Sequence, residues 1–353
     1  MKTLACLLII LLLSGPAAAQ RTSLPPRIVS APWKEATISV RRFDPIRSFL
    51  IDVGKYEPVA QGIVSKTQLE YWRLPPEAAA EFLLLRAPGT DHGYIRLVRF
   101  TGVEQTPIRI GASAWDPGGY FSLMFRVKDI ARVFEKAAAL GFQGESEPIR
   151  FVFDSGDGSL PSDLGNVVIK APDGINFALY ERNSPPLSDY WDFEVLSQPF
   201  NAMQMVEHAD ISYGFFREEL GFKAFYSDDF IDPVPSYNNF GLPQNLTTEI
   251  TRRTRNLWPK PGETGRLELM EFVGLEGRNF RRRAAPPNIG ILSVSYPVLD
   301  ADLAFDLFRD AGGLPKYALR TFELQPYGTV AMFTAEAPDG ALVNVFEVLE
   351  EAS

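Results

Sequence analysis

Imidazole and thiol groups are scarce in this chain, and that scarcity limits its chemistry. The 353 residues include two histidines, His92 and His208, and one cysteine, Cys6. A Ser-His-Asp arrangement or a multi-histidine metal site would have to use one or both histidines. Thiolate catalysis, disulfides and a cysteine-rich zinc site would all depend on Cys6, which we expect to be removed from the mature protein. Any site must therefore rely mainly on other polar side chains.

The first nineteen residues have the pattern of a secretory signal. Lys2 precedes an apolar run over residues 4–13, and a small-residue cleavage site ends at Ala19. The apolar run is about ten residues long, whereas a membrane-spanning helix needs about twenty. We predict a signal peptide over residues 1–19 and a soluble mature protein, periplasmic or secreted, with the periplasm favoured because no cysteine remains. The alternatives are an N-terminal membrane anchor and a lipid attachment at Cys6.

The charge balance of the chain argues against several classes of partner. The formal net charge is −9, and 46% of the residues are hydrophobic. An acidic surface disfavours DNA, RNA and anionic lipid, and the basic run Arg281–Arg283 is expected to be a solvated loop. The remaining length of about 330 residues is enough for two domains with packed cores.

The sequence contains an internal repeat. Gly119–Asp129 aligns without a gap with Gly290–Asp300, and Gly, Ser, Val and Asp coincide. Each segment alternates apolar residues with a period of two and then changes to helical spacing that ends at glycine. The turn sequence Ala171-Pro-Asp-Gly174 recurs as Ala337-Pro-Asp-Gly340, each time before an apolar strand. These segments predict two copies of a strand, a helix and several strands.

Two further copies precede these two. Tyr94–Gly102 parallels Arg266–Gly274, and Met203–Met205 leads into a helical pattern that closes at Gly221-Phe222. The N-terminal copy, from Ala36 to about Val103, is the least regular, and its helix cannot be placed from the pattern. The strand–helix–strands unit is therefore expected four times.

This order of motifs resembles the vicinal oxygen chelate superfamily of glyoxalases, bleomycin-resistance proteins and extradiol dioxygenases. The residues that carry the resemblance are Val127-Lys-Asp129, Leu140-Gly-Phe142, Leu220-Gly-Phe222 and the two Pro-Asp-Gly turns. The resemblance implies an α+β fold of four βαβββ modules paired into two glyoxalase-like domains, over residues 20–185 and 196–350. In that superfamily the curved sheets of two paired modules close around a cavity.

The resemblance also locates the positions that hold a metal in the superfamily, where a histidine on the first strand and a glutamate on the last strand are the ligands. The corresponding residues here are Thr37, Arg96, Ser122 and Ala178 in the first domain, and Asn201, Glu268, Ser293 and Asn344 in the second. Of these eight residues, only Glu268 is of a type that binds the metal in the superfamily. Because one carboxylate does not make a divalent-metal site, we expect no metal and no other cofactor.

Neither histidine is expected to replace the missing ligands. His208 falls at the junction of a strand and a helix, where it should point to the helix start. His92 lies in the turn Gly89–Gly93, and we expect it to be solvated at a hairpin tip.

The remaining polar positions favour a binding function. Hydroxyls, amides and one carboxylate can orient an uncharged or cationic ligand, while aromatic walls bury it. We predict an exported protein that binds a small, largely apolar molecule. The predicted ligand-binding residues are Thr37, Arg96, Ser122, Asn201, Ser293 and Asn344.

Other functions stay open at this point. A lyase, isomerase or dioxygenase-type enzyme of the same superfamily is the main alternative, with Glu268, Arg96 or a tyrosine as acid or base. Glu268 is the first choice as general base, because desolvation would raise its pKa. Misaligned metal ligands and a purely structural role are further alternatives. If Leu267 and Leu269 face the cavity, Glu268 must face away from it, since neighbouring strand residues point to opposite sides.

Overall fold

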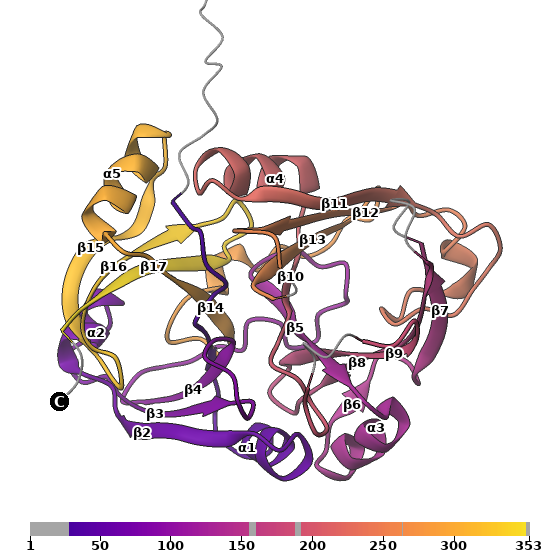
Figure 1. Cartoon of the computed structure of the whole chain (residues 1–353), viewed down its shortest axis with the longest axis horizontal. Helices are drawn as coiled ribbons and strands as arrows, with labels where there is room; N and C mark the ends of the chain where they lie inside the picture. The colour runs from indigo at the N-terminus through magenta and orange to yellow at the C-terminus, as the bar shows by residue number, and fades with distance from the viewer. Residues whose placement is uncertain (1–27, 155–159, 188–191, 263, 351–353) are drawn as a thin grey trace, which may run out of the picture.

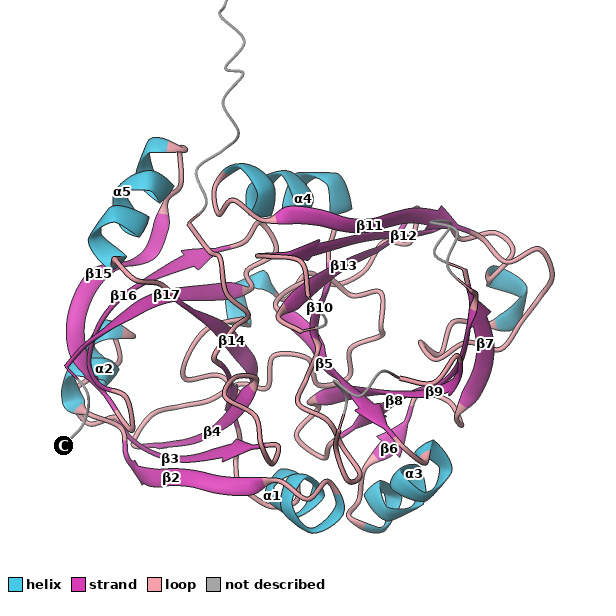
Figure 2. Cartoon of the chain, in the orientation of Figure 1, coloured by secondary structure: helices cyan, strands magenta, loops and turns pink. Residues whose placement is uncertain are grey.

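The computed structural model describes residues 28–154, 160–187, 192–262 and 264–350. The predicted signal peptide and its cleavage site lie outside the described residues. Two strongly curled sheets stand side by side, and helices lie at their outer sides (Figures 1 and 2). The chain passes from the first sheet to the second and returns to the first near its C-terminal end.

Four copies of a strand–helix–strands module follow one another along the chain. Module 1 comprises β1 (Glu35–Ser39), α1 (Ile46–Ser48) with a π-helical turn (Phe49–Val53), β2 (Glu57–Ile63), α2 (Lys66–Tyr71), β3 (Ala79–Arg86) and β4 (Tyr94–Thr101). Module 2 comprises β5 (Tyr120–Val127), α3 (Ile130–Ala139), β6 (Gln143–Gly144), β7 (Ile149–Phe153), β8 (Ser162–Lys170) and β9 (Asn176–Ser184). Module 3 comprises β10 (Asn201–Met205), α4 (Ala209–Glu218), β11 (Lys223–Phe230), a 3₁₀ turn (Gln244–Leu246), β12 (Arg252–Trp258) and β13 (Arg266–Phe272). A 3₁₀ turn (Arg281–Arg283) precedes module 4, which comprises β14 (Gly290–Pro297), α5 (Ala301–Asp310), β15 (Pro315–Leu324), β16 (Gly328–Glu336) and β17 (Leu342–Glu350).

The modules pair through their first strands. β1 runs antiparallel to β14, with Thr37 opposite Ser293, and β5 runs antiparallel to β10, with Ser122 opposite Met203. One sheet therefore has the order β15-β16-β17-β14-β1-β4-β3-β2, and the other has the order β11-β12-β13-β10-β5-β9-β8-β6. We call the concave side of the first sheet the 1/4 cup and that of the second sheet the 2/3 cup, after the modules that form them.

This pairing corrects the expectation that modules pair in chain order within residues 20–185 and 196–350. Module 1 pairs with module 4, and module 2 pairs with module 3. A first strand offers one free edge that any other first strand can cover. The linkers 102–119, 185–200 and 273–289 have similar lengths, so chain length does not select the partner. The choice depends on side-chain packing between modules, which strand periodicity does not reveal.

The helix starts confirm the internal repeat. Asp129 precedes α3 and Asp300 precedes α5, and each carboxylate accepts a hydrogen bond from a backbone N–H of the first helical turn. The backbone conformations of the two aspartates are nearly identical. A side-chain acceptor at this position satisfies an N–H that has no partner within the helix, and this accounts for the recurrence of aspartate.

A second carboxylate supports the same helix starts in three modules. Glu181, Glu271 and Glu347 lie near the ends of β9, β13 and β17, and each accepts a hydrogen bond from the first backbone N–H of its module's helix. Each of these bonds fixes the helix against the last strand of the same module. The recurrence also aligns the last strands of modules 2, 3 and 4 with one another.

Three hydrophobic clusters hold the elements together. The largest lies between the two sheets and under the helices, and it includes Trp33, Phe125, Phe177 and Tyr296. The second cluster lines the 1/4 cup, and the third lines the 2/3 cup. The inner strands of each sheet, such as β5, β9, β10 and β13, have one face in the central cluster and the other in a cup, so their successive residues alternate between these two environments.

We predict that Asp129→Ala and Asp300→Ala each lower the free energy of unfolding by about 1 kcal/mol, because each removes one helix N-cap. Urea titration followed by circular dichroism measures the change. Glu135→Ala, on the exposed face of α3, is the control and should be near neutral. Equal stabilities for all three variants would contradict the role of the repeated aspartates.

Candidate functional site

Strand alternation determines which residues face each cup. On β13, Leu267 and Leu269 pack in the central cluster, whereas Met270 packs inside the 2/3 cup. Glu268 therefore shares the concave face with Met270. On β10, Asn201 shares the concave face with Met203 in the same way. The alternative in which Leu267 and Leu269 face the cup is thereby excluded.

The eight positions derived from the superfamily separate into the two cups, in a different combination from the expected one. Thr37, Arg96, Ser293 and Asn344 lie on the strands of the 1/4 cup, and Ser122, Ala178, Asn201 and Glu268 lie on those of the 2/3 cup. Each expected domain thus contributes half of each cup.

The register of the sheets also corrects one of the eight positions. In modules 2, 3 and 4 the last-strand residue pairs with the residue two places after the first-strand position, as Glu268 pairs with Met203. In module 1, Arg96 pairs with Thr37, so the first-strand residue two places before that partner is Glu35. The backbone N–H of Val40, five places after Glu35, donates to the carbonyl oxygen of Val98, as Val206 donates to Met270 in module 3 and Val298 to Phe346 in module 4. The expected first-strand position at Thr37 is therefore wrong by one pleat, whereas Arg96 was aligned correctly.

Polar groups in the 1/4 cup bind one another. The hydroxyl of Tyr71 lies 2.8 Å from that of Thr334, which donates to the Asn344 side-chain oxygen at 2.8 Å. The Asn344 amide then donates to Ser293 at 3.1 Å and to Ser295 at 3.0 Å. Tyr71 lies on α2, an insertion whose aromatic residues pack against β15. The protein itself therefore occupies the hydrogen-bonding capacity of this floor.

Arg96 is likewise bound within the protein. Its guanidinium donates to both oxygens of Glu35, at 2.6 and 2.8 Å, and to the Gln325 carbonyl oxygen at 2.8 Å. Tyr327 donates to the same Glu35 carboxylate at 2.8 Å. Both members of the pair are about 98% buried, so charge pairing and hydrogen bonding offset their desolvation. Arg96 is structural here rather than available to a ligand.

Glu268 has a different environment in the 2/3 cup. The Asn201 amide donates to its carboxylate at 3.2 Å, and the part of the chain that the structure describes holds no ion pair to it. Burial raises the pKa of Glu268 from 4.5 to about 7, although the Asn201 hydrogen bond lowers it. The side chain keeps part of its surface accessible. A desolvated carboxyl group that solvent can still reach is suited to hold or exchange a proton near neutral pH.

Three buried oxygen atoms on the strands of this cup have no protein partner among the described residues. They are Ser122 Oγ, Asn176 Oδ1 and Asn201 Oδ1. Ser122 and Asn176 are paired neighbours on β5 and β9, on the face that carries Met124 and Ala178 into the cup. Buried oxygens of this kind normally bind a partner, because leaving them unmatched is costly. Asn176 was missed by the sequence analysis, which considered one position per last strand.

The walls of the 2/3 cup are aromatic and are completed by the insertion between β11 and β12. Phe240 of that insertion packs against Phe121 and Phe272, with ring centroids 6.2 and 5.6 Å apart. The neighbouring Asn239 amide donates to the Asn166 side-chain oxygen on β8. Burial, and then the charge of Glu268, raise the pKa of Tyr180. The insertion therefore contacts three strands of the concave face and encloses the polar floor.

The donors of the 2/3 cup do not fit a catalytic transition metal. Of the residues described above, Glu268 offers one carboxylate, Asn176 and Asn201 offer two amide oxygens and Ser122 offers one hydroxyl, whereas Ala178 provides no donor. Among the described residues no three His, Cys, Asp or Glu side chains converge. Transition metals in proteins favour imidazole, thiolate or several carboxylates, and none of these sets is present at this floor.

Neither histidine belongs to a cluster of potential metal ligands among the described residues. His208 precedes α4 at the predicted junction and makes no side-chain cap hydrogen bond there. His92 is not solvated as expected, because its side chain is 18% exposed. Its Nδ1 lies 2.6 Å from the Asp91 carboxylate, and its Nε2 lies 2.7 Å from the Thr264 hydroxyl. It therefore links a hairpin of one sheet to a loop of the other.

Solved structures share this architecture. A variant of glyoxalase I from Zea mays superimposes with a TM-score of 0.57 at 17% identity, covering 90% of this chain and 94% of that one. Wild-type Zea mays glyoxalase I gives 0.55, and a putative dioxygenase from Bacillus subtilis gives 0.53 at 13% identity, covering 92% and 87% of the two chains. No family model and no curated protein sequence matches the chain. The chain has the fold of the vicinal oxygen chelate superfamily, as its motifs indicated.

We predict that Glu268 makes the folded protein less stable as pH rises. Its carboxyl pKa is about 7 in the folded state against 4.5 for an unperturbed group, so the folded state holds the proton more tightly. The stabilisation is complete below about pH 4.5 and is lost as pH rises through about 7, by up to about 3 kcal/mol. The difference in unfolding free energy between wild type and Glu268→Gln should change with pH across this range. A constant difference would contradict the raised pKa, and Glu135→Gln provides the control for an exposed glutamate.

Proposed function

We propose that the 2/3 cup binds a small, largely apolar molecule that carries hydrogen-bond donors and is uncharged or cationic, without a metal. The observation that carries this proposal is that Ser122, Asn176 and Asn201 have buried oxygens without partners on the same concave face as the desolvated Glu268. A ligand in the cup would supply the hydrogen bonds that these oxygens lack. Its apolar part would lie against Phe240, Phe272 and the methionines of the floor.

The polarity of the floor favours one class of ligand. Asn176 Oδ1, Asn201 Oδ1 and the Glu268 carboxylate are acceptors, and the Asn201 amide is already donated to Glu268. An amine, alcohol or amide N–H of the ligand matches these acceptors, whereas a carboxylate or phosphate would face them with like charge. Arg126 lies on the same face, but its guanidinium stacks on Phe200 at 4.2 Å. The site therefore favours donor groups over anions.

The 1/4 cup offers less to a ligand on its floor. Asn344, Ser293 and Thr334 already bind one another, and Arg96 is paired with Glu35. A ligand would have to break these hydrogen bonds before it could form its own. We therefore propose that Ser122, Asn201, Asn176 and Glu268 form the site, and that Thr37, Arg96, Ser293 and Asn344 maintain the other cup.

The proposed setting is outside the cytoplasm. It rests on the N-terminal pattern of a signal peptide that ends near Ala19. Within the described ranges, no helix is long and apolar enough to cross a membrane. The protein would then meet its ligand in the periplasm or after secretion.

A second candidate function is metal-independent acid–base catalysis in the same cup. The pKa of about 7 for Glu268 favours it, because a carboxyl group that titrates near working pH can both accept and return a proton. A lyase or isomerase that moves a proton at a bound substrate would use Glu268 as the base. Asn201 would hold the carboxylate in place, since its amide donates a hydrogen bond to Glu268 at 3.2 Å.

Naphthylmethylamine, an aromatic cation, tests the proposed site. We expect it to bind up to about tenfold more tightly at about pH 8 than at about pH 6, because Glu268 ionises between them. Glu268→Gln should remove this pH dependence, and naphthylmethanol, which has no charge, should show little of it. Isothermal titration calorimetry measures both probes. Unchanged amine affinity in Glu268→Gln, with Glu135→Gln behaving as wild type, would exclude Glu268 from the site.

The purified protein should contain well under one transition-metal ion per chain, because its cup floors lack a matching donor set. Elemental analysis by mass spectrometry measures this directly. About one zinc, iron, manganese or nickel ion per chain, removed by a chelator together with amine binding, would contradict the proposed metal-independent site.

A further inference from the structure

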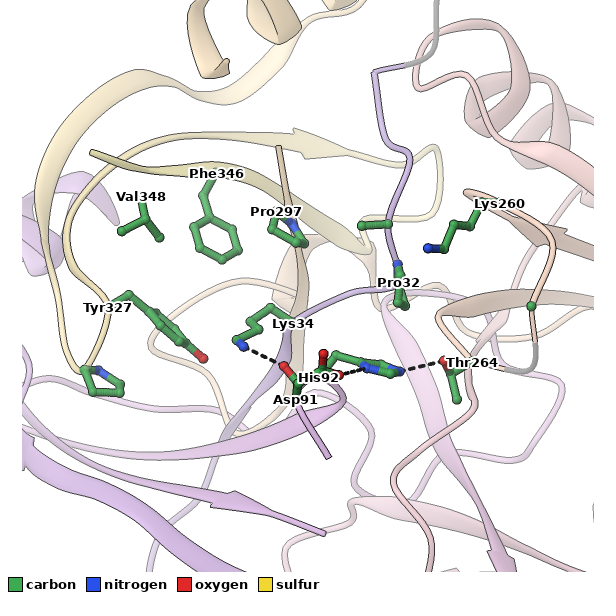
Figure 3. Close-up of a pocket in the computed structure, with 13 residues that line it drawn as sticks. Pro32, Lys34, Asp91, His92, Lys260, Thr264, Pro297, Tyr327, Phe346 and Val348 are labelled. Atoms are coloured by element: carbon green, nitrogen blue, oxygen red, sulfur yellow. Dashed lines mark hydrogen bonds and ion pairs between the residues drawn. The ribbon is translucent and has the colours of Figure 1, made fainter. Parts of the chain in front are cut away.

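A cavity lies at the seam between the two sheets, beside the 1/4 cup, whose hydrophobic cluster supplies Phe346 and Tyr327 to its wall. Its volume is about 740 Å³, which is ample for a drug-sized ligand. The wall comes from the segment before β1, the β3–β4 hairpin, the β12–β13 loop, the β15–β16 turn and β17. Figure 3 shows the side chains around it, with Tyr327 and Phe346 on one side and Thr264 and Lys260 on the other. We call it the seam pocket.

The seam pocket is basic in an acidic protein. Lys34 and Lys260 line it, whereas Asp91 is the one acidic side chain among the described lining residues. Asp91 is engaged by His92, whose hydrogen bond lowers the pKa of the Asp91 carboxyl group. The chain as a whole carries a net charge of −9. A local excess of positive charge in such a chain favours an anionic group at this place.

Lys34 is held in position by its neighbours. Its ammonium group donates to the Asp91 carbonyl oxygen at 2.5 Å and lies 4.7 Å from the ring centroid of Tyr94 and 5.9 Å from that of Tyr327. An ammonium group has three donors, and the carbonyl uses one of them. The aromatic rings orient the ammonium group, and its charge also helps to lower the pKa of the Asp91 carboxyl group, whose side chain is 93% exposed. The remaining N–H donors of Lys34 can still bind an anion.

The opposite wall is apolar and rigid. Tyr327 and Phe346 lie with ring centroids 5.9 Å apart, and Val348 continues this surface on β17. Proline residues complete the wall, namely Pro32, Pro297 and Pro326. Such a surface buries an aromatic or aliphatic body at little cost in side-chain entropy.

His92 keeps the two sides of the seam pocket at a fixed separation. It belongs to the β3–β4 hairpin of one sheet and contacts Thr264 in the β12–β13 loop of the other at 2.7 Å. The same ring contacts Asp91 at 2.6 Å. The pocket is thus built from both sheets and closed at its base by a hydrogen-bonded bridge.

We propose that the seam pocket binds an amphipathic organic anion, with its carboxylate, sulfonate or phosphate at Lys34 and Lys260 and its apolar body against Tyr327, Phe346 and Val348. The ligand class is opposite in charge to the one that fits the 2/3 cup. The two sites share no lining residue, so this proposal stands independently of the proposed function.

Anilinonaphthalene sulfonate and N-phenylnaphthylamine provide a matched pair of probes, since the second lacks the sulfonate of the first. Fluorescence titration should show about one sulfonate probe bound per chain, with affinity that falls as salt is added. Lys34→Gln and Lys260→Gln should each weaken the sulfonate probe by about fivefold and leave the neutral probe unchanged. Lys136→Gln, an exposed lysine on α3, should behave as wild type.

Two further variants locate the bound probe. Val348→Trp should abolish the binding of both probes, because the larger side chain fills the pocket beside Phe346. Glu268→Gln should leave sulfonate binding unchanged, which separates this site from the 2/3 cup. Equal weakening by Lys136→Gln, or full binding by Val348→Trp, would overturn the proposal. Loss of sulfonate binding in Glu268→Gln would assign the anion to the cup and would equally overturn it.

Discussion

The antiparallel pairing of first strands between modules is the interaction on which the rest of the molecule depends. A single module has a first strand with one uncovered edge, whose N–H and C=O groups require partners. Pairing β1 with β14 and β5 with β10 covers these edges and curls each pair of modules into one cup. The same pairing decides which polar residues meet. Ser122 and Asn176 of module 2 share a concave face with Asn201 and Glu268 of module 3 because these two modules share a sheet.

The two cups share this framework but differ in how their buried polar residues are hydrogen-bonded. In the 1/4 cup the insertion α2 and the residues around Asn344 satisfy one another, and the buried Arg96–Glu35 pair adds a closed ionic network. In the 2/3 cup the floor retains unmatched acceptors and a carboxyl group with a raised pKa. Buried polar atoms without partners are costly. A ligand could therefore stabilise the 2/3 cup by bonding its unpartnered acceptors, whereas Asn344 and its polar neighbours in the 1/4 cup already have partners.

Sequence reasoning found the modules, because their evidence is local. The Gly119–Asp129 repeat, the helix-starting aspartates and the Pro-Asp-Gly turns each depend on a few neighbouring residues. The repeat also placed Glu268 on a strand, although the sequence left open which face of that strand points into the cup. The approach failed where the outcome depends on distant packing. It paired modules in chain order, placed the first-strand position of module 1 at Thr37 instead of Glu35, and took His92 for a solvated hairpin tip. The residues around His92 do not indicate its partner Thr264, because Thr264 is 172 positions away in the chain.

The most direct test is to locate a bound ligand that carries a hydrogen-bond donor. A crystal structure of the protein soaked with naphthylmethylamine would show the amine and its contacts. The account predicts density in the 2/3 cup, with the ammonium group within hydrogen-bonding distance of Glu268 and at least one of Asn201, Asn176 and Ser122, and the naphthyl ring against Phe240 or Phe272. Density for the amine at the floor of the 1/4 cup, with the 2/3 cup unchanged, would contradict it.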